Sequence, residues 1–295
     1  MTKNWIRVDI SCGAAAADDL GAELADSLGV SVEFIPEGLR IYFDSALFAR
    51  NQKMLREIID SASETCHHEI PLSFSEIPDE DWSRTWKAHF KPLRVGRRFL
   101  IAPTWESVEP GPEVLVIRID PGRAFGTGHH ETTRLCLEWL EAWAEAQKAR
   151  SAPPGSILDV GTGSGILAIG AGLLGFVDIL GIDNDPDAVE VAVLNAELNP
   201  APGNIRFVCA TPDGVPGLFD VLISNIQALP LIRMSGTLVS KVRAGGKLVL
   251  SGILAEQADE VRKNFETKGA VHLGTRAAGE WVLLDFTITK RNSDE

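Results

Sequence analysis

The amino-acid sequence predicts an α/β protein in which a smaller α+β domain precedes a doubly wound sheet of seven strands. Three observations carry this prediction. Residues 156–183 read as a buried strand, a glycine-rich turn, a helix and a second strand that ends in a carboxylate. Beyond them, helix and strand patterns keep alternating, which builds a mostly parallel sheet covered on both faces. The first 75 residues show a different order of elements, and a chain of 295 residues has room for both domains.

The N-terminal 75 residues read as one small unit. Residues 5–10 alternate as a strand does, and residues 16–28 have helical periodicity. Two strands between residues 30 and 43 are separated by a Pro-Glu-Gly turn, and a helix over 47–62 follows. A last strand near 69–74 completes a β-α-β-β-α-β order, which is typical of a ferredoxin-like domain. The unit has no obvious catalytic constellation, so we interpret it as a recognition module.

A connecting helix is expected next, at residues 76–91. Acidic residues at 79–81 would complement the positive end of its helix dipole. Trp82 and Trp86 lie four positions apart, which places both indoles on one helical face. The second domain then covers residues 92–295, and its first strands are short runs before residue 119.

The segment from Asp120 to Thr133 carries two glycines beside paired hydroxyl and histidine side chains, and it precedes a helix expected over 135–146. This composition suits a loop that folds over a small ligand, with Thr127 as one of its hydroxyls. Thr132 and Thr133 have two interpretations, since they either cap the helix or bond the amino-acid end of a cofactor.

The glycine-rich turn has the pattern D-x-G-x-G-x-G, from Asp159 to Gly165. Its glycines permit backbone conformations that a Cβ would forbid, and a ligand can then approach main-chain N–H groups at the helix start. Asp183 ends the next strand, where its carboxylate can accept both hydroxyls of a ribose. The pattern predicts a nucleoside pocket, and a glycine turn without a ligand is the competing interpretation.

Details of the turn distinguish between nucleoside cofactors. A dinucleotide site requires G-x-G-x-x-G, but Ile166 stands where the third glycine belongs. The Asp159 carboxylate repels a pyrophosphate and favours the positively charged end of S-adenosylmethionine. No Gly-Lys-Ser/Thr sequence follows the turn, which argues against a nucleoside triphosphate. The predicted cofactor is therefore S-adenosylmethionine.

The remaining chain predicts the rest of the sheet and one catalytic candidate. Asp185 and Pro186 give the second helix an N-cap and a proline at its first position. Asn225 ends the fourth strand, where polar groups of open α/β sheets meet the ligand. Its side-chain oxygen would accept a hydrogen bond from an attacking amine, unless it only terminates the strand. Asp213, which follows the third strand, is a candidate for the adenine contact. The strands are expected at 156–160, 178–183, 205–210, 219–225 and 246–252, with an antiparallel pair at 271–276 and 281–288.

Composition limits the partners. A formal net charge of −13 argues against broad nucleic-acid binding and is compatible with a basic protein partner. The four cysteines lack C-x-x-C spacing, and adjacent histidines point apart on a helix or strand, so no metal is expected. No apolar run approaches the length of a membrane span, and Arg7 and Asp9 interrupt the apolar residues near the N-terminus, so no signal-peptide core is expected there. We expect a cytoplasmic monomer that binds neither nucleic acid nor membrane.

Four sequence blocks together resemble the PrmA family, the methyltransferases of the large-subunit ribosomal protein L11. The first two blocks are distinctive of that family, whereas the glycine motif is shared by most methyltransferases with this Rossmann-like sheet. The blocks are DWSRTWKAHFKP at 81–92, FGTGHHETT at 125–133, LDVGTGSG at 158–165, and NIQALPL at 225–231 with SGIL at 251–254.

The resemblance implies a substrate-recognition domain at 1–75, a linker helix at 76–91 and a methyltransferase domain at 92–295. It implies methyl transfer from S-adenosylmethionine to lysine side chains and the α-amino group of L11. In that reaction we expect Asn225 to orient the amine and Phe125 to wall the methyl channel. The expected cofactor-binding residues are Thr127, Thr132, Thr133, Asp159, Gly161, Thr162, Gly163, Gly165, Asp183, Asn184 and Asn225.

The chain departs from the usual family sequence at His129, Glu131, Gln227 and Leu229. These residues flank the expected cofactor and amine channel, so they affect the substrate more than the cofactor. Three alternatives stay open: a lysine methyltransferase with another protein target, a small-molecule methyltransferase, and a non-catalytic S-adenosylmethionine-binding assembly factor.

Overall fold

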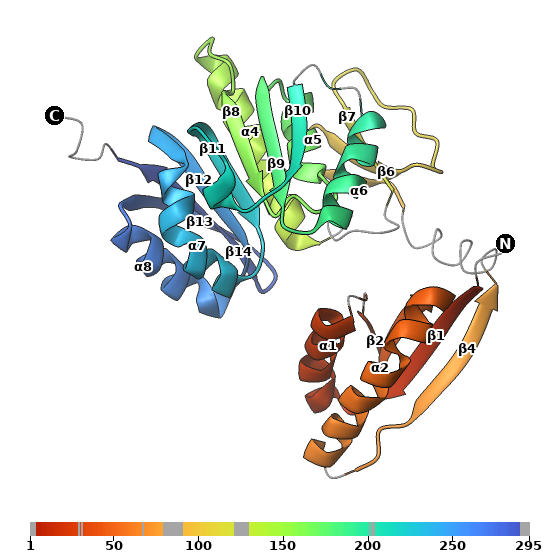
Figure 1. Cartoon of the computed structure of the whole chain (residues 1–295). Helices are drawn as coiled ribbons and strands as arrows, with labels where there is room; N and C mark the ends of the chain where they lie inside the picture. Colours follow the sequence, from red (N-terminus) through yellow and green to blue (C-terminus); the bar gives the residue numbers. More distant parts are fainter. Residues whose placement is uncertain are drawn as a thin grey trace. The chain divides into compact units, whose positions relative to one another are not determined.

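The computed structural model divides the chain into two compact units, Met1–His89 and Phe90–Glu295 (Figure 1). The residues it describes are 4–28, 30, 32–66, 68–78, 91–120, 130–199, 201 and 204–289.

The first unit has the predicted β-α-β-β-α-β order. Its antiparallel sheet has the strand order β2-β3-β1-β4, and its core includes Val8, Ile41 and Phe43, all fully buried. The elements are β1 (Asn4–Ser11), α1 (Ala14–Leu28), β2 (Val32–Ile35), β3 (Gly38–Asp44), α2 (Ser45–Cys66) and β4 (Leu72–Pro78).

Strand β4 lies later in the chain than the sequence predicts. The prediction placed it near 69–74, but its pairing with β1 starts at Leu72 opposite Ile10 and runs to Pro78 opposite Asn4. The whole length of β1 is available as a partner, so the strand continues into the first residues of the expected linker helix. The rest of that helix, with Trp82 and Trp86, lies outside the described residues.

The second unit contains the predicted seven-stranded sheet, in the order β10-β9-β8-β11-β12-β14-β13. Along this order, each strand from β10 through β9, β8 and β11 to β12 pairs in parallel with the next. Strand β14 runs antiparallel to both of its neighbours, β12 and β13. Its elements are β8 (Ser156–Val160), α5 (Ile166–Leu173), β9 (Asp178–Asp183), α6 (Pro186–Glu197), β10 (Asn204–Cys209), β11 (Phe219–Asn225), α7 (Ala228–Ser240), β12 (Val242–Leu254), α8 (Ala258–Thr267), β13 (Ala270–Ala278) and β14 (Trp281–Ile288).

Alternate residues of the central strands enter two separate hydrophobic cores. Ile157 and Val221 pack in the core that also contains residues of α5 and of α4 (Glu131–Ala149), whereas Leu158 and Leu222 pack with residues of α7 and α8. Every residue of β8 is buried. A strand covered on both faces in this way reads as the continuous apolar run from which it was predicted.

A small second sheet lies within the same unit, in the order β5-β6-β7. Strand β7 pairs in parallel with β6 on one side and is the last strand of this sheet. It ends at Ile119, directly before the segment in which the sequence places a ligand-binding loop. The strands are β5 (Leu93–Val95), β6 (Phe99–Pro103) and β7 (Leu115–Ile119).

Candidate active site

The glycine-rich turn wraps around the end of β9. The N–H groups of Gly161 and Thr162 both donate to the carbonyl of Ile182, at 2.9 Å each. Gly161, Gly163 and Gly165 have φ angles of 72°, 52° and 79°, which other residues rarely adopt. The turn therefore needs its glycines, and its folding brings the start of α5 beside the tip of β9.

The Asp183 carboxylate is held by two loops at this tip. Its Oδ2 accepts a hydrogen bond from the Gly163 N–H at 3.0 Å, and its Oδ1 accepts one from the Asp185 N–H at 3.1 Å. The side chain remains partly exposed. Carboxylate oxygens have several lone pairs, so a fixed and accessible carboxylate can still accept the hydroxyls of a ribose. The exposed Asn184 follows it directly.

Asp159 is buried beneath the same turn. The Thr162 hydroxyl donates to its Oδ2 at 2.7 Å, while its Oδ1 is buried without a hydrogen-bond partner among the described residues. Burial raises the pKa of the carboxyl to about 7, and the negative charge of Asp183 adds to this. The hydrogen bond from Thr162 and the nearby Ala168 N–H act in the opposite direction. An unused buried acceptor of this kind fits the cationic end of a ligand.

Asn225 meets the start of α4, although the two are far apart in the sequence. Its Nδ2 lies 3.4 Å from the Thr133 hydroxyl, and Thr133 is fully buried. Strands β8 and β11 are neighbours, so this contact lies one strand away from the glycine turn. Two segments that the sequence analysis selected independently, around Thr133 and around Asn225, therefore come together at the carboxyl ends of the strands.

The cap of α4 corrects one interpretation. His130 is the N-cap, and its Nδ1 accepts the Thr132 N–H at 3.4 Å and lies 2.8 Å from the Thr132 hydroxyl. Thr132 and Thr133 thus belong to the first turn of the helix, and capping is not their role. The imidazole also packs edge-on against Trp281, with ring centroids 4.9 Å apart. No local motif marks Trp281, because only the tertiary fold brings it to this position.

Comparison with known proteins identifies the family of the chain. The family model of ribosomal protein L11 methyltransferases (PrmA) matches residues 4–289. The ribosomal protein L11 methyltransferase of Pelobacter propionicus is 40% identical over an alignment of 310 positions. The alignment covers 99% of this chain and 100% of that protein. The chain belongs to the PrmA family. Its relative in Geobacter sulfurreducens is 41% identical and covers 97% of the chain, and 99% of that relative is matched.

A solved structure extends the likeness to the fold of this PrmA-family chain. The ribosomal protein L11 methylase of Lactobacillus delbrueckii subsp. bulgaricus superposes with a TM-score of 0.61 and 30% identity, over 68% of this chain and 100% of that one. The predicted family and fold class are confirmed. The expected enzyme class, an S-adenosylmethionine-dependent methyltransferase, is confirmed with them.

Not every predicted site residue can be placed. Phe125 and Thr127 lie outside the described residues. Asp213 is exposed, in a short 3₁₀ turn (Pro212–Gly214) after β10. Within the described part of the chain, no group of three His, Cys, Asp or Glu side chains could hold a metal ion. No described helix is long and apolar enough to span a membrane.

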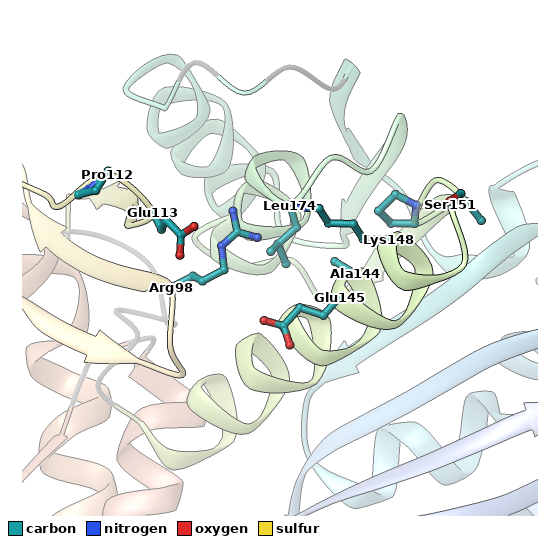
Figure 2. A pocket seen from close by; sticks show the side chains of 10 residues that line it. Arg98, Pro112, Glu113, Ala144, Glu145, Lys148, Ser151 and Leu174 are labelled. Atoms are coloured by element: carbon teal, nitrogen blue, oxygen red, sulfur yellow. The ribbon is translucent and has the colours of Figure 1, made fainter.

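A cavity of about 570 Å³ lies away from this site, between α4 and the segments around β6 (Figure 2). Arg98 and Glu113 lie on one side of it, and Glu145 and Lys148 of α4 lie on the other. Its lining includes Pro154, which precedes β8, so the cavity is near the amino end of that strand. Those predicted site residues that the structure describes lie toward the carboxyl ends instead, and none of them lines the cavity.

Replacing Asp159 with asparagine tests the raised pKa. An unfolded carboxyl ionises near its ordinary value of 3.8, whereas the folded one keeps its proton up to about 7. Between these values the folded state binds more protons, so this group lowers the free energy of unfolding as pH rises. We therefore expect Asp159→Asn to stabilise the protein more at pH 8 than at pH 5, as measured by urea unfolding. An equal effect at both pH values would contradict the raised pKa.

The Gly161→Ala variant tests the need for close approach at the turn. A Cβ there would lie 2.5 Å from Cγ2 of Ile226, in addition to the strain at a positive φ of 72°. Gly175 is a matched control, because its φ is 93° but a Cβ would meet no atom within 4 Å. In both variants, backbone strain should lower the free energy of unfolding by about 1 kcal/mol or more. Thermal unfolding should show a clearly larger loss for Gly161→Ala, and equal losses would exclude the clash.

Proposed function

We propose that this protein transfers methyl groups from S-adenosylmethionine to lysine side chains and to the N-terminal amine of ribosomal protein L11. The observation that carries the proposal is that the candidate residues converge at the ends of neighbouring strands. Asp159 is on β8, Asp183 ends β9 and Asn225 ends β11, where it contacts Thr133 at the start of α4. The names of the family and of its relatives support L11 as the substrate.

The proposed cofactor fits the groups that are present. S-adenosylmethionine supplies an electrophilic methyl group on a sulfonium centre. Asp183 would hold the ribose, and the unpartnered Oδ1 of Asp159 would receive the ammonium, directly or through water. The glycine turn allows the ligand to lie against main-chain N–H groups. The proposed cofactor-binding residues at the glycine turn and the tip of β9 also include Gly161, Thr162, Gly163, Gly165 and Asn184. Those proposed from the loop and from the start of α4 are Thr127, Thr132 and Thr133.

The acceptor amine must lose a proton before it attacks. A lysine with a pKa of about 10.4 needs roughly 4–5 kcal/mol for this at neutral pH. A channel of low polarity lowers that pKa, and the proton can then leave to water. The Nδ2 of Asn225 faces Thr133, so its Oδ1 remains to accept an N–H of the amine and aim the nitrogen lone pair. Phe125 is the proposed wall of the methyl channel.

The N-terminal unit is the proposed recognition domain for L11. Because β4 runs to Pro78, its boundary with the linker lies after residue 78 and not at 75, and the methyltransferase domain is proposed to cover 92–295. The net charge of −13 supports a basic protein as the partner, because opposite charges speed encounter at low ionic strength. We propose a cytoplasmic monomer that binds neither nucleic acid nor membrane.

Incubation with labelled S-adenosylmethionine and recombinant L11 tests the function. We expect the intact mass of L11 to rise in steps of one methyl group, and peptide mapping to place the label on lysines and on the N-terminus. Cofactor binding is measured by calorimetry in the same sample. Cofactor binding without any mass increment on L11 would contradict L11 as the substrate. Methylation of a different protein would then identify that protein as the substrate.

A further inference from the structure

Two buried asparagines stand at the end of α6, and the reaction described above uses neither. Asn195 is 1% exposed and Asn199 is 4% exposed, while Leu194 and Leu198 on the same segment are 53% and 45% exposed. A segment that buries amides and exposes leucines reverses the usual preference. Buried amides are normally paired, so their partners show what they do.

Asn199 completes the outer edge of β7. Its Oδ1 accepts the Arg118 N–H at 2.7 Å, and its Nδ2 donates to the Arg118 carbonyl at 2.6 Å. Both groups point away from β6, since β7 is the last strand of its sheet. Asn195 continues the same edge, because its Oδ1 accepts the N–H of Asp120 at 3.0 Å. The two amides bind Arg118 and Asp120, which are alternate residues along one edge of β7 and its end, so they take the place of a neighbouring strand there.

The other end of Asn195 reaches the glycine turn. Its Nδ2 donates to the carbonyl of Ser164 at 2.9 Å. Ser164 follows Gly163, whose N–H is bound to the Asp183 carboxylate. Asp120 directly precedes the segment 121–129, which contains Phe125 and Thr127. One buried amide therefore joins the backbone of the glycine turn to the residue before the predicted ligand-binding loop.

We propose that Asn195 is a positioning residue for the cofactor site, because it fixes the spacing between the glycine turn and Asp120 at the end of β7. It acts through Ser164 and Asp120 and does not itself touch the ligand. Without its amide, the buried Ser164 carbonyl and the Asp120 N–H both lose a hydrogen bond, and the side chain that joins the two backbones is gone. A site that must be reassembled on binding has a lower affinity than a preorganised one. This inference rests on the proposed function, because it concerns the same cofactor.

The test compares Asn195→Ala with Asn199→Ala, which removes at least as many hydrogen bonds but none to the glycine turn. Binding of S-adenosylhomocysteine is measured by calorimetry, and unfolding temperatures are measured in parallel. We expect both variants to be less stable, but only Asn195→Ala to raise the Kd, by about tenfold. Its KM for S-adenosylmethionine should rise similarly, with kcat and the KM for L11 within twofold of the parent.

Two results would overturn the inference: a Kd for Asn195→Ala within twofold of the parent, or an equal rise in both variants. If Asn195→Ala does not fold, Asn195→Asp takes its place. That variant keeps an acceptor for Asp120 but turns an oxygen toward the Ser164 carbonyl, so it should also weaken binding. Failure of the parent itself to bind S-adenosylhomocysteine would instead contradict the proposed cofactor, which separates the two claims.

Discussion

Replacing Asp183 with alanine is expected to weaken the binding of S-adenosylmethionine about 100-fold. The carboxylate would accept the ribose hydroxyls, and charge-assisted hydrogen bonds contribute about 1.5–3 kcal/mol each. Losing about 2.8 kcal/mol corresponds to two orders of magnitude in Kd. The variant also removes the acceptor that fixes Gly163 and Asp185, so the glycine turn loses an anchor. Calorimetric titration of the purified protein measures the change directly.

Asp178→Ala is the matched control for this variant. Asp178 lies on the same strand as Asp183 but at its opposite end, where it forms an exposed ion pair with Arg206 at 3.0 Å. Exposed pairs contribute little, so its removal should change neither cofactor affinity nor stability by much. A Kd for Asp183→Ala within threefold of the parent would refute the ribose contact.

Asn225→Ala is expected to slow methyl transfer about 100-fold at saturating cofactor and substrate. The loss reflects orientation, since a misplaced nucleophile can cost about this factor even when binding persists. Cofactor affinity should fall by no more than about fivefold, because Asp183 and the glycine turn are untouched. Single-turnover experiments with labelled cofactor separate the rate of transfer from binding.

Asn204→Ala serves as the control for general effects of losing an asparagine, because Asn204 is exposed at the start of β10. Its single-turnover rate should equal that of the parent. If saturating cofactor restores the rate of Asn225→Ala, then Asn225 binds the cofactor and does not orient the amine. A single-turnover rate equal to that of the parent at subsaturating cofactor as well would remove Asn225 from the site altogether.

Local patterns were sufficient to predict much of the sheet. Strands such as β8 and β11 are apolar runs whose burial follows from being covered on both faces. Asp185 and Pro186 start α6 as predicted, because an N-cap depends on residues only two or three positions away. By contrast, β12 runs from Val242 to Leu254, beyond the predicted 246–252, because Val242 pairs with Phe219 of β11 at its start and β14 offers partners for Ile253 and Leu254 at its end.

Features that depend on distant residues were not predictable from local patterns. The cap of α4 is His130 because its ring lies between Thr132 and Trp281, and Trp281 comes from the far end of the chain. The role of Asn195 depends on β7 and the glycine turn both lying beside α6. An asparagine in an ordinary helix pattern has no signal of its own, so only the fold reveals its partners.

A crystal structure of the protein with S-adenosylhomocysteine would show whether the cofactor binds at the glycine turn and Asp183. We expect the ribose hydroxyls on the Asp183 carboxylate, the ligand along the glycine turn, and its amino group near Oδ1 of Asp159. Asn195 should keep its hydrogen bonds to Ser164 and Asp120. A ligand bound instead in the cavity between α4 and the segments around β6, with Asp183 making no contact, would contradict the account.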